Sequence, residues 1–270
     1  MRPRTARAAR LLASAAVAAV LALSVAGCKT TGDDITGSIA ASDAPRSDAD
    51  WRRSLEVWGA HYRENPNDAD VAMGYARALR ATDQRAQAVA VLQQATIRNP
   101  HNMPLLGAYG RALAEAGDYN QALDVLSRAH TPDNPDWRIL NAQGAVLDQL
   151  GRHAEAQGHY SAALKIVPND SSVLSNLGLS YALTKDLKRA EATLRQAVAR
   201  PDAAPKARQN LALVVGLQGR FAEAEKIASA DLSPDEAAAN VTYLRQMLAQ
   251  RGDWPKKGGR QFVPSPDAGT

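Results

Sequence analysis

Five histidines, one cysteine and scattered carboxylates are the side chains of this sequence with the most chemistry to offer. A zinc or catalytic site needs such groups at fixed spacings, for example His-Glu-x-x-His, paired cysteines, or Gly-x-Ser-x-Gly around a nucleophile. None of these patterns occurs, and no Gly-rich segment ends in Gly-Lys-Ser or Gly-Lys-Thr to hold a phosphate. The sequence therefore predicts no catalytic residue, no metal site, no cofactor and no small-molecule substrate.

The histidines and acids have simpler explanations. His153 and His159 are six residues apart, which places them on different sides of a helix, and we interpret His153 as a packing residue. Asp118 and Glu155 fall at predicted turns, where helix capping explains them better than acid–base catalysis. An enzyme acting on peptidoglycan would need a clustered acid pair or a nucleophile, and the sequence offers neither.

The cysteine points to a different chemistry, because a thiol can carry a lipid. Cys28 follows Val-Ala-Gly, and before it come four arginines and an apolar run, 11–23, that is short for a membrane span. Residues 1–27 are therefore typical of a signal peptide. Val-Ala-Gly-Cys resembles the bacterial lipobox, which implies cleavage before Cys28 and lipidation of its sulfur. The alternative is an ordinary cleavage site beside an unrelated cysteine.

Removal of residues 1–27 changes the charge balance of the chain. Four of the 32 Lys and Arg residues leave and no acid does, so 28 basic side chains face 28 acidic ones. A balanced chain gives no reason to expect a nucleic-acid partner. Residues 28–48 carry Cys28 and then mainly small and polar residues, which predicts a flexible tether, and residues 252–270 predict a disordered tail. Lys29 directly after the cysteine implies, by resemblance to bacterial lipoproteins, an outer-membrane anchor facing the periplasm.

Residues 49–251 are organised by a period of 34. Alanine recurs at one position of the period, and a small residue recurs twelve residues before it, where two helices would cross closely. The alanines are Ala88, Ala122, Ala156, Ala190 and Ala224, and the small residues are Ala76, Gly110, Gly144, Gly178 and Ala212. Each period reads as helix, turn, helix, with Gly151 between the two helices of the middle copy and Asp170 as an N-cap for the next.

This pattern resembles the tetratricopeptide repeat, a family of 34-residue helix pairs. The resemblance implies an all-α, right-handed superhelical solenoid of about five helix pairs. The predicted repeats are 69–102, 103–136, 137–170, 171–204 and 205–238, with an extra N-terminal helix near Trp51 to Asp68 and a capping helix near Asp235 to Arg251. It also implies that the first helix of each pair lines a groove, with partner-binding residues Arg77, Arg80, Arg111, Asn141, Leu179, Leu183, Leu213 and Leu217.

The groove residues change from charged to apolar along the chain. Leu179/Leu183 and Leu213/Leu217 are i,i+4 pairs in neighbouring repeats, a geometry that could hold the apolar face of a partner helix. The alternative is that the capping helix or a second copy covers these leucines.

Residues 163–197 and 208–228 also resemble the TadD lipoproteins of the tight-adherence (Flp) pilus assembly system. That resemblance implies a non-enzymatic scaffold that assists assembly or secretin placement of a type IV-like pilus secretion machine. Its partners would be proteins of that machinery. The alternative partner class is peptidoglycan enzymes or outer-membrane protein assembly, for which the chain would be an adaptor.

Overall fold

The computed structural model describes residues 47–201 and 203–250. The predicted signal peptide 1–27, Cys28, the tether up to residue 46 and the predicted tail 252–270 lie outside the described residues. The described residues form twelve α-helices and no strand. The helices are α2 (Asp48–Glu64), α3 (Ala69–Ala81), α4 (Arg85–Arg98), α5 (Met103–Ala116), α6 (Tyr119–Ser127), α7 (Trp137–Gln149), α8 (His153–Ile166), α9 (Ser171–Leu183), α10 (Leu187–Val198), α11 (Pro205–Leu217), α12 (Phe221–Ala228) and α13 (Pro234–Gln250).

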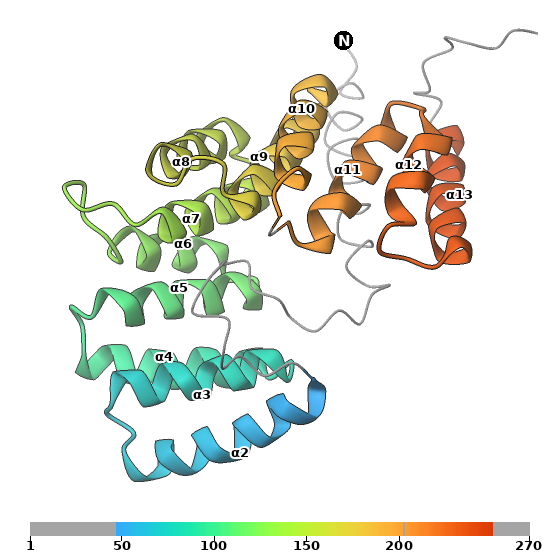
Figure 1. Cartoon of the computed structure of the whole chain (residues 1–270). Coiled ribbons are helices and arrows are strands. Elements are labelled where there is room, and N and C mark those ends of the chain that lie inside the picture. The colour runs from blue at the N-terminus through green and yellow to red at the C-terminus, as the bar shows by residue number, and fades with distance from the viewer. Residues whose placement is uncertain (1–46, 202, 251–270) are drawn as a thin grey trace, which may run out of the picture. The chain divides into compact units, whose positions relative to one another are not determined.

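The prediction of an all-α chain built from repeated helix pairs is confirmed (Figure 1). The extra helix before the first repeat is α2, which begins at Asp48, with the Ser47 side chain accepting a hydrogen bond from the backbone N–H of Asp50. The helix after the last repeat is α13. The chain divides into two compact units, Met1–Asn210 and Leu211–Thr270, and the division falls inside α11.

The first unit is a stack in which each helix from α2 to α10 contacts the next one along the chain. The first helices of consecutive pairs also contact one another, α3 with α5, α5 with α7 and α7 with α9, whereas among the described residues the second helices make no such contacts. The stack is therefore tighter on the side of the first helices. We call the surface formed by α3, α5, α7 and α9 the first-helix surface.

The first helices of the repeats begin and end in the same way. In the first four pairs, a side chain just before the first helix accepts hydrogen bonds from backbone N–H groups of its first turn. One or two residues after each first helix, a residue has positive φ. The caps are Asp68, Asn102, Asp136 and Asp170. The residues of positive φ at the 34-residue spacing are Asp83, Gly117, Gly151, Lys185 and Gly219, with φ between 61° and 91°. Glycine is favoured there because a left-handed conformation costs it nothing.

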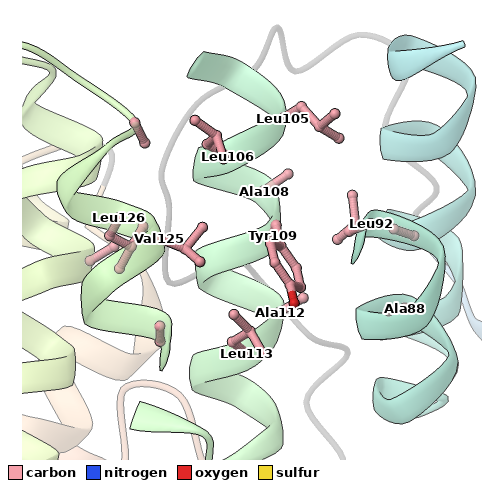
Figure 2. Packing of buried hydrophobic residues seen from close by; sticks show 14 of the residues in the cluster. Ala88, Leu92, Leu105, Leu106, Ala108, Tyr109, Ala112, Leu113, Val125 and Leu126 are labelled. Carbon is pink, nitrogen blue, oxygen red and sulfur yellow. The ribbon is translucent and has the colours of Figure 1, made fainter. Parts of the chain in front are cut away.

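The periodic small residues form the centre of each pair, as predicted. The five alanines of the second helices are at most 1% exposed, and Leu92, Leu126, Tyr160 and Leu194 one turn later are also buried. At Gly110, Gly144 and Gly178 an added Cβ would lie 2.5 Å from an atom of the large residue opposite. Figure 2 shows the cluster around α5, in which Leu105, Tyr109 and Leu113 occupy the space between neighbouring helices. Close helix crossing therefore requires the small residues.

The second unit has its own small core. Ala212, Ala228 and Ala237 are buried together, with Ile227 and Leu232 packed against them. An added Cβ at Gly216 would lie 2.5 Å from Leu244 of α13. The second helix of this pair, α12, is short and ends at Ala228. The next helix, α13, packs directly on it.

Candidate partner-binding surface

The structure places all eight predicted groove residues on first helices of the repeats. Within the first unit these helices are α3 with Arg77 and Arg80, α5 with Arg111, α7 with Asn141, and α9 with Leu179 and Leu183. In the second unit Leu213 and Leu217 lie on the last two turns of α11. The side chains of these residues differ strongly in their exposure and partners, and only some of them are open to a partner.

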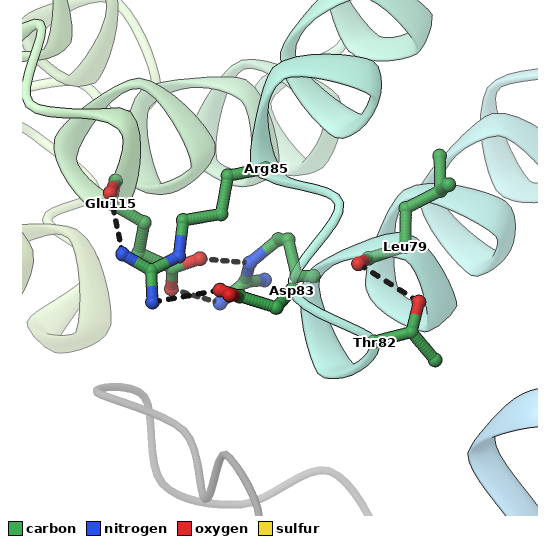
Figure 3. A network of polar contacts seen from close by, with 6 residues as sticks. Leu79, Thr82, Asp83, Arg85 and Glu115 are labelled. Atoms are coloured by element: carbon green, nitrogen blue, oxygen red, sulfur yellow. Dashed lines mark hydrogen bonds and ion pairs between the residues drawn. The ribbon is translucent and has the colours of Figure 1, made fainter.

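Arg80 is held in an ion pair between repeats. Its Nε donates to Glu115 Oε2 at 2.6 Å and its Nη2 contacts Oε1 of the same carboxylate, and the two side chains are 15% and 18% exposed. Arg85 adds a bond of 3.4 Å from Nη1 to the backbone carbonyl of Glu115 and pairs with Asp83 at 3.0 Å (Figure 3). A two-point guanidinium–carboxylate contact fixes geometry strongly. Arg80 therefore joins α3 to α5 rather than standing ready for a ligand.

Arg77 and Arg111 occupy the same position of consecutive repeats. Arg77 is exposed, whereas Arg111 is half-buried and its guanidinium lies along α5, so that an added Cβ at Gly107 would be 3.4 Å from Arg111 Nη1. The same Cβ position is 2.7 Å from Ile139 Cδ1 on α7. The Arg111 guanidinium therefore lies against its own helix beside Gly107, at the place where Ile139 of α7 packs on α5.

Asn141 is not part of an open surface, which corrects the prediction that its side chain faces a partner. It is 0% exposed. Its Oδ1 accepts a hydrogen bond of 3.0 Å from Asn176 Nδ2, and its Nδ2 lies 3.5 Å from Ser172 Oγ, both on α9. Asn210 on α11 donates to Ser175 Oγ of α9 at 2.9 Å. These polar side chains hold neighbouring first helices together, because a buried amide must find partners inside the protein.

A second polar cluster surrounds Asp148 at the end of α7. Its carboxylate accepts hydrogen bonds from Ser180 Oγ at 2.8 Å and Tyr160 OH at 3.0 Å, and lies 2.8 Å from His153 Nδ1. No sequence motif indicates this cluster, because its partners are separated from Asp148 by 5, 12 and 32 residues. His153 is half-buried, so it is a packing residue that also binds a carboxylate.

The burial of this cluster changes the acidity of two groups. Burial raises the pKa of the Asp148 carboxyl, while the hydrogen bonds from His153, Ser180 and Tyr160 act in the opposite direction. Burial first, and then the charge of Asp148, raise the pKa of Tyr160 well above its usual value. Since the folded-state pKa of Asp148 is raised, its ionisation costs folding stability as pH rises through that pKa. The hydrogen bonds from His153, Tyr160 and Ser180 limit that cost. Because these side chains lie on α8 and α9, the same bonds join α7 to both helices.

The leucines are the apolar part of the first-helix surface. Leu179 and Leu183 on α9 are partly exposed, although Val173, Leu177 and Ala182 of the same helix are buried. An i,i+4 pair lies on one face of a helix. This pair is therefore a ridge that the core of the first unit does not fully cover.

In the second unit, Leu213 and Leu217 are partly exposed in the same way, whereas Val214 and Val215 between them are buried. They form an i,i+4 pair on α11. Each unit thus carries one partly exposed leucine pair on a first helix.

The described residues hold neither a metal-binding cluster nor a membrane-spanning helix. No group of three or more His, Cys, Asp or Glu side chains there could hold a metal ion. No helix in 47–201 or 203–250 is long and apolar enough to cross a membrane.

Repeated helix pairs with small residues at their crossings and side-chain caps at their starts define a helical repeat scaffold. Residues 83–144 and residues 141–208 each match a family model described as tetratricopeptide repeat. Residues 83–208 of this chain therefore consist of tetratricopeptide repeats. Comparison with curated proteins finds no match to it.

Solved structures of other repeat proteins are similar in fold. A tetratricopeptide repeat protein from Parabacteroides merdae ATCC 43184 is 12% identical, with a TM-score of 0.63 over 72% of this chain and 78% of that one. Human IFIT1, solved as a dimer with m7Gppp-AAAA, is 16% identical, with a TM-score of 0.60 over 76% of this chain and 52% of that one. The APC/C hetero-tetramer Cut9–Hcn1 gives 14% identity, a TM-score of 0.59 and coverage of 76% and 44%. These likenesses concern the fold alone.

Proposed function

We propose that this protein is a lipid-anchored scaffold of the outer membrane, facing the periplasm, that assists assembly or secretin placement of a tight-adherence (Flp) pilus secretion system. Tetratricopeptide repeats are a protein–protein interaction scaffold and in general a non-catalytic fold. The observation that carries the proposal is the pair Leu179/Leu183, which stays partly exposed on a helix whose Val173, Leu174 and Leu177 are buried. We propose the Flp pilus system in particular because residues 163–197 and 208–228 resemble the TadD lipoproteins.

The leucine pairs suit an amphipathic helix of a partner protein. A helix presents apolar residues at i, i+3, i+4 and i+7, and a ridge of two leucines one turn apart matches that spacing. Burial of such a ridge against a partner removes apolar surface from water at about 25 cal/mol per Å². A charge placed on the ridge would have to be desolvated, which opposes binding.

The test is co-purification of the secretin with the full-length protein. Leu179→Glu combined with Leu183→Glu is expected to reduce co-purified secretin at least about tenfold, the equivalent of roughly 1.4 kcal/mol, and to reduce surface pili. The second pair, Leu213→Glu with Leu217→Glu, tests the other unit in the same way. Thermal melts of each variant separate lost binding from lost folding.

Ile97→Glu is the matched control, because Ile97 is 66% exposed on the second helix α4 and receives the same added charge. This variant is expected to retain the secretin and the pili. Normal pili and normal co-purification in the leucine variants would show that the leucines are ordinary surface. Recovery of murein hydrolases in place of secretin would favour an adaptor of peptidoglycan enzymes.

The anchor is tested separately at Cys28, which carries the lipid in this proposal. Cys28→Ala is expected to abolish incorporation of an acyl analogue and to release the protein from membranes, because attached acyl chains supply the anchor. Metabolic labelling followed by membrane fractionation measures both effects. Label that persists in the variant would contradict lipidation at this residue.

A further inference from the structure

The connection between α6 and α7 differs from its equivalents in the neighbouring repeats. The helix α6 has 9 residues and ends at Ser127, whereas α4 and α8, the second helices before and after it, have 14 each. Residues 128–136 take the place of the missing helical turns, and Ala129 anchors them, since it is only 4% exposed. We call residues 128–136 the α6–α7 loop. Its last residue, Asp136, is the N-cap of α7, so the loop leads directly into a helix of the first-helix surface.

The α6–α7 loop carries a histidine, His130, that lies near His159 of α8. Both side chains are half-buried, and the Nδ1 atom of each is shielded from water without a hydrogen-bond partner among the described residues. A charge on His130 acts on His159, so the two rings are neighbours, because such interactions weaken with distance. A neutral imidazole keeps one ring nitrogen as an acceptor, whereas an imidazolium has a proton on both. Protonation of either ring therefore creates a buried N–H donor that no described residue accepts.

We propose that this pair of histidines makes the contact between the α6–α7 loop and α8 sensitive to pH, so that mildly acidic solution releases the loop from α8. Two effects act in the same direction. A buried donor without an acceptor is costly, and two imidazolium rings repel each other. Release of the loop gives both rings water as a partner. Because Asp136 caps α7, a released loop also loosens the start of that helix.

The charges at the start of α8 do not cancel this effect. Glu155 favours a charged His159, but Glu155 is exposed and binds Arg152, whose own charge acts in the opposite direction. Burial first, and then the charge of His130, lower the pKa of His159. Since this pKa is lowered in the folded state, the contact is most stable above the unfolded value of about 6.5. It loses stability as pH falls below that value towards the folded-state pKa.

The two helices that pack on α8 bring no further charge to the histidine pair. On α7, Asp148 binds His153, and Arg138 lies over the Trp137 ring. The sequence of α9 has no charged residue, and its titratable side chain, Tyr181, packs under an arginine of α10. The charged residues of α6 and of the α6–α7 loop are exposed to solvent, where salt screens them: Asp124, Arg128, Asp133 and Asp136.

Hydrogen exchange of the full-length protein tests the proposal, measured by mass spectrometry with exposure times corrected for the intrinsic effect of pH. Between about pH 7.5 and about pH 5.5, protection of peptides that cover residues 128–136 is expected to fall at least about fivefold. The helix α4 has no histidine and should keep its protection. His159→Gln should leave the loop equally protected at both pH values. His101→Gln is the matched control, because His101 is an exposed histidine outside the pair, and its loop should respond as in the wild type.

His130→Gln is a second variant for the case in which His159→Gln unfolds α8. It removes the repulsion from the loop side and is expected to reduce the response of the loop to pH. Circular dichroism establishes which variants are folded. Equal protection of the wild-type loop at both pH values would overturn the proposal. An undiminished response in a folded His159→Gln or His130→Gln protein would do so as well.

Discussion

Gly144→Ala is expected to lower the free energy of unfolding by about 2–3 kcal/mol, as overpacking of a tight core does. The added Cβ would lie 2.5 Å from Tyr160 Cε1 and 2.8 Å from Cδ1 and Cζ. Tyr160 is 1% exposed, and its hydroxyl is held by Asp148, so the ring cannot withdraw without breaking that bond. The loss would occur although alanine is favoured over glycine inside helices by about 0.5–1 kcal/mol. Urea denaturation followed by circular dichroism measures the change.

Removal of the opposing ring provides the control for this prediction. A leucine would not be enough, because Leu126 and Leu194 also lie 2.5 Å from a Cβ added at Gly110 and Gly178. Tyr160→Ala removes the ring, and Gly144→Ala should cost much less in that background than in the wild type. A double-mutant cycle isolates the coupling between the two positions. An equal cost of Gly144→Ala in both backgrounds would show that the tyrosine ring is not the obstacle.

Asn141→Ala is expected to destabilise the protein by about 2 kcal/mol, because it removes a buried partner from Asn176 and Ser172. A residue that only contacted a partner protein would leave stability unchanged on truncation. Chemical denaturation of the purified variant therefore separates the structural role of Asn141 from the binding role that the sequence predicted. The expected loss is in the contact between α7 and α9.

Arg77→Ala is the comparison for Asn141→Ala, since Arg77 is an exposed residue of the same first-helix surface. Its stability should stay within about 0.5 kcal/mol of the wild type, as for most surface substitutions. If Asn141→Ala were equally neutral, the hydrogen bonds between α7 and α9 would contribute nothing to folding, and Asn141 would again be a candidate for binding.

The sequence by itself determined the repeat, its helices and its core. Alanine at Ala156 and its equivalents, glycine at Gly144, and the cap at Asp170 each follow from a local requirement of close crossing or of helix initiation. The same requirement returns every 34 residues, so the pattern is visible without coordinates. The extra helices α2 and α13 could be predicted as well, because the terminal repeats of such a stack need a cover.

Only the tertiary structure decided which polar side chains of the first helices are open and which are used between repeats. Arg80 binds Glu115, which is 35 residues away in sequence, and Asn141 is buried against α9. Asp148 accepts a hydrogen bond from Ser180 of the next repeat. Repeat position places a residue on a face of its helix, but the rotamer and the distance to the neighbouring helix determine whether two side chains meet. The period could not show these contacts, because they join residues that differ from one repeat to the next.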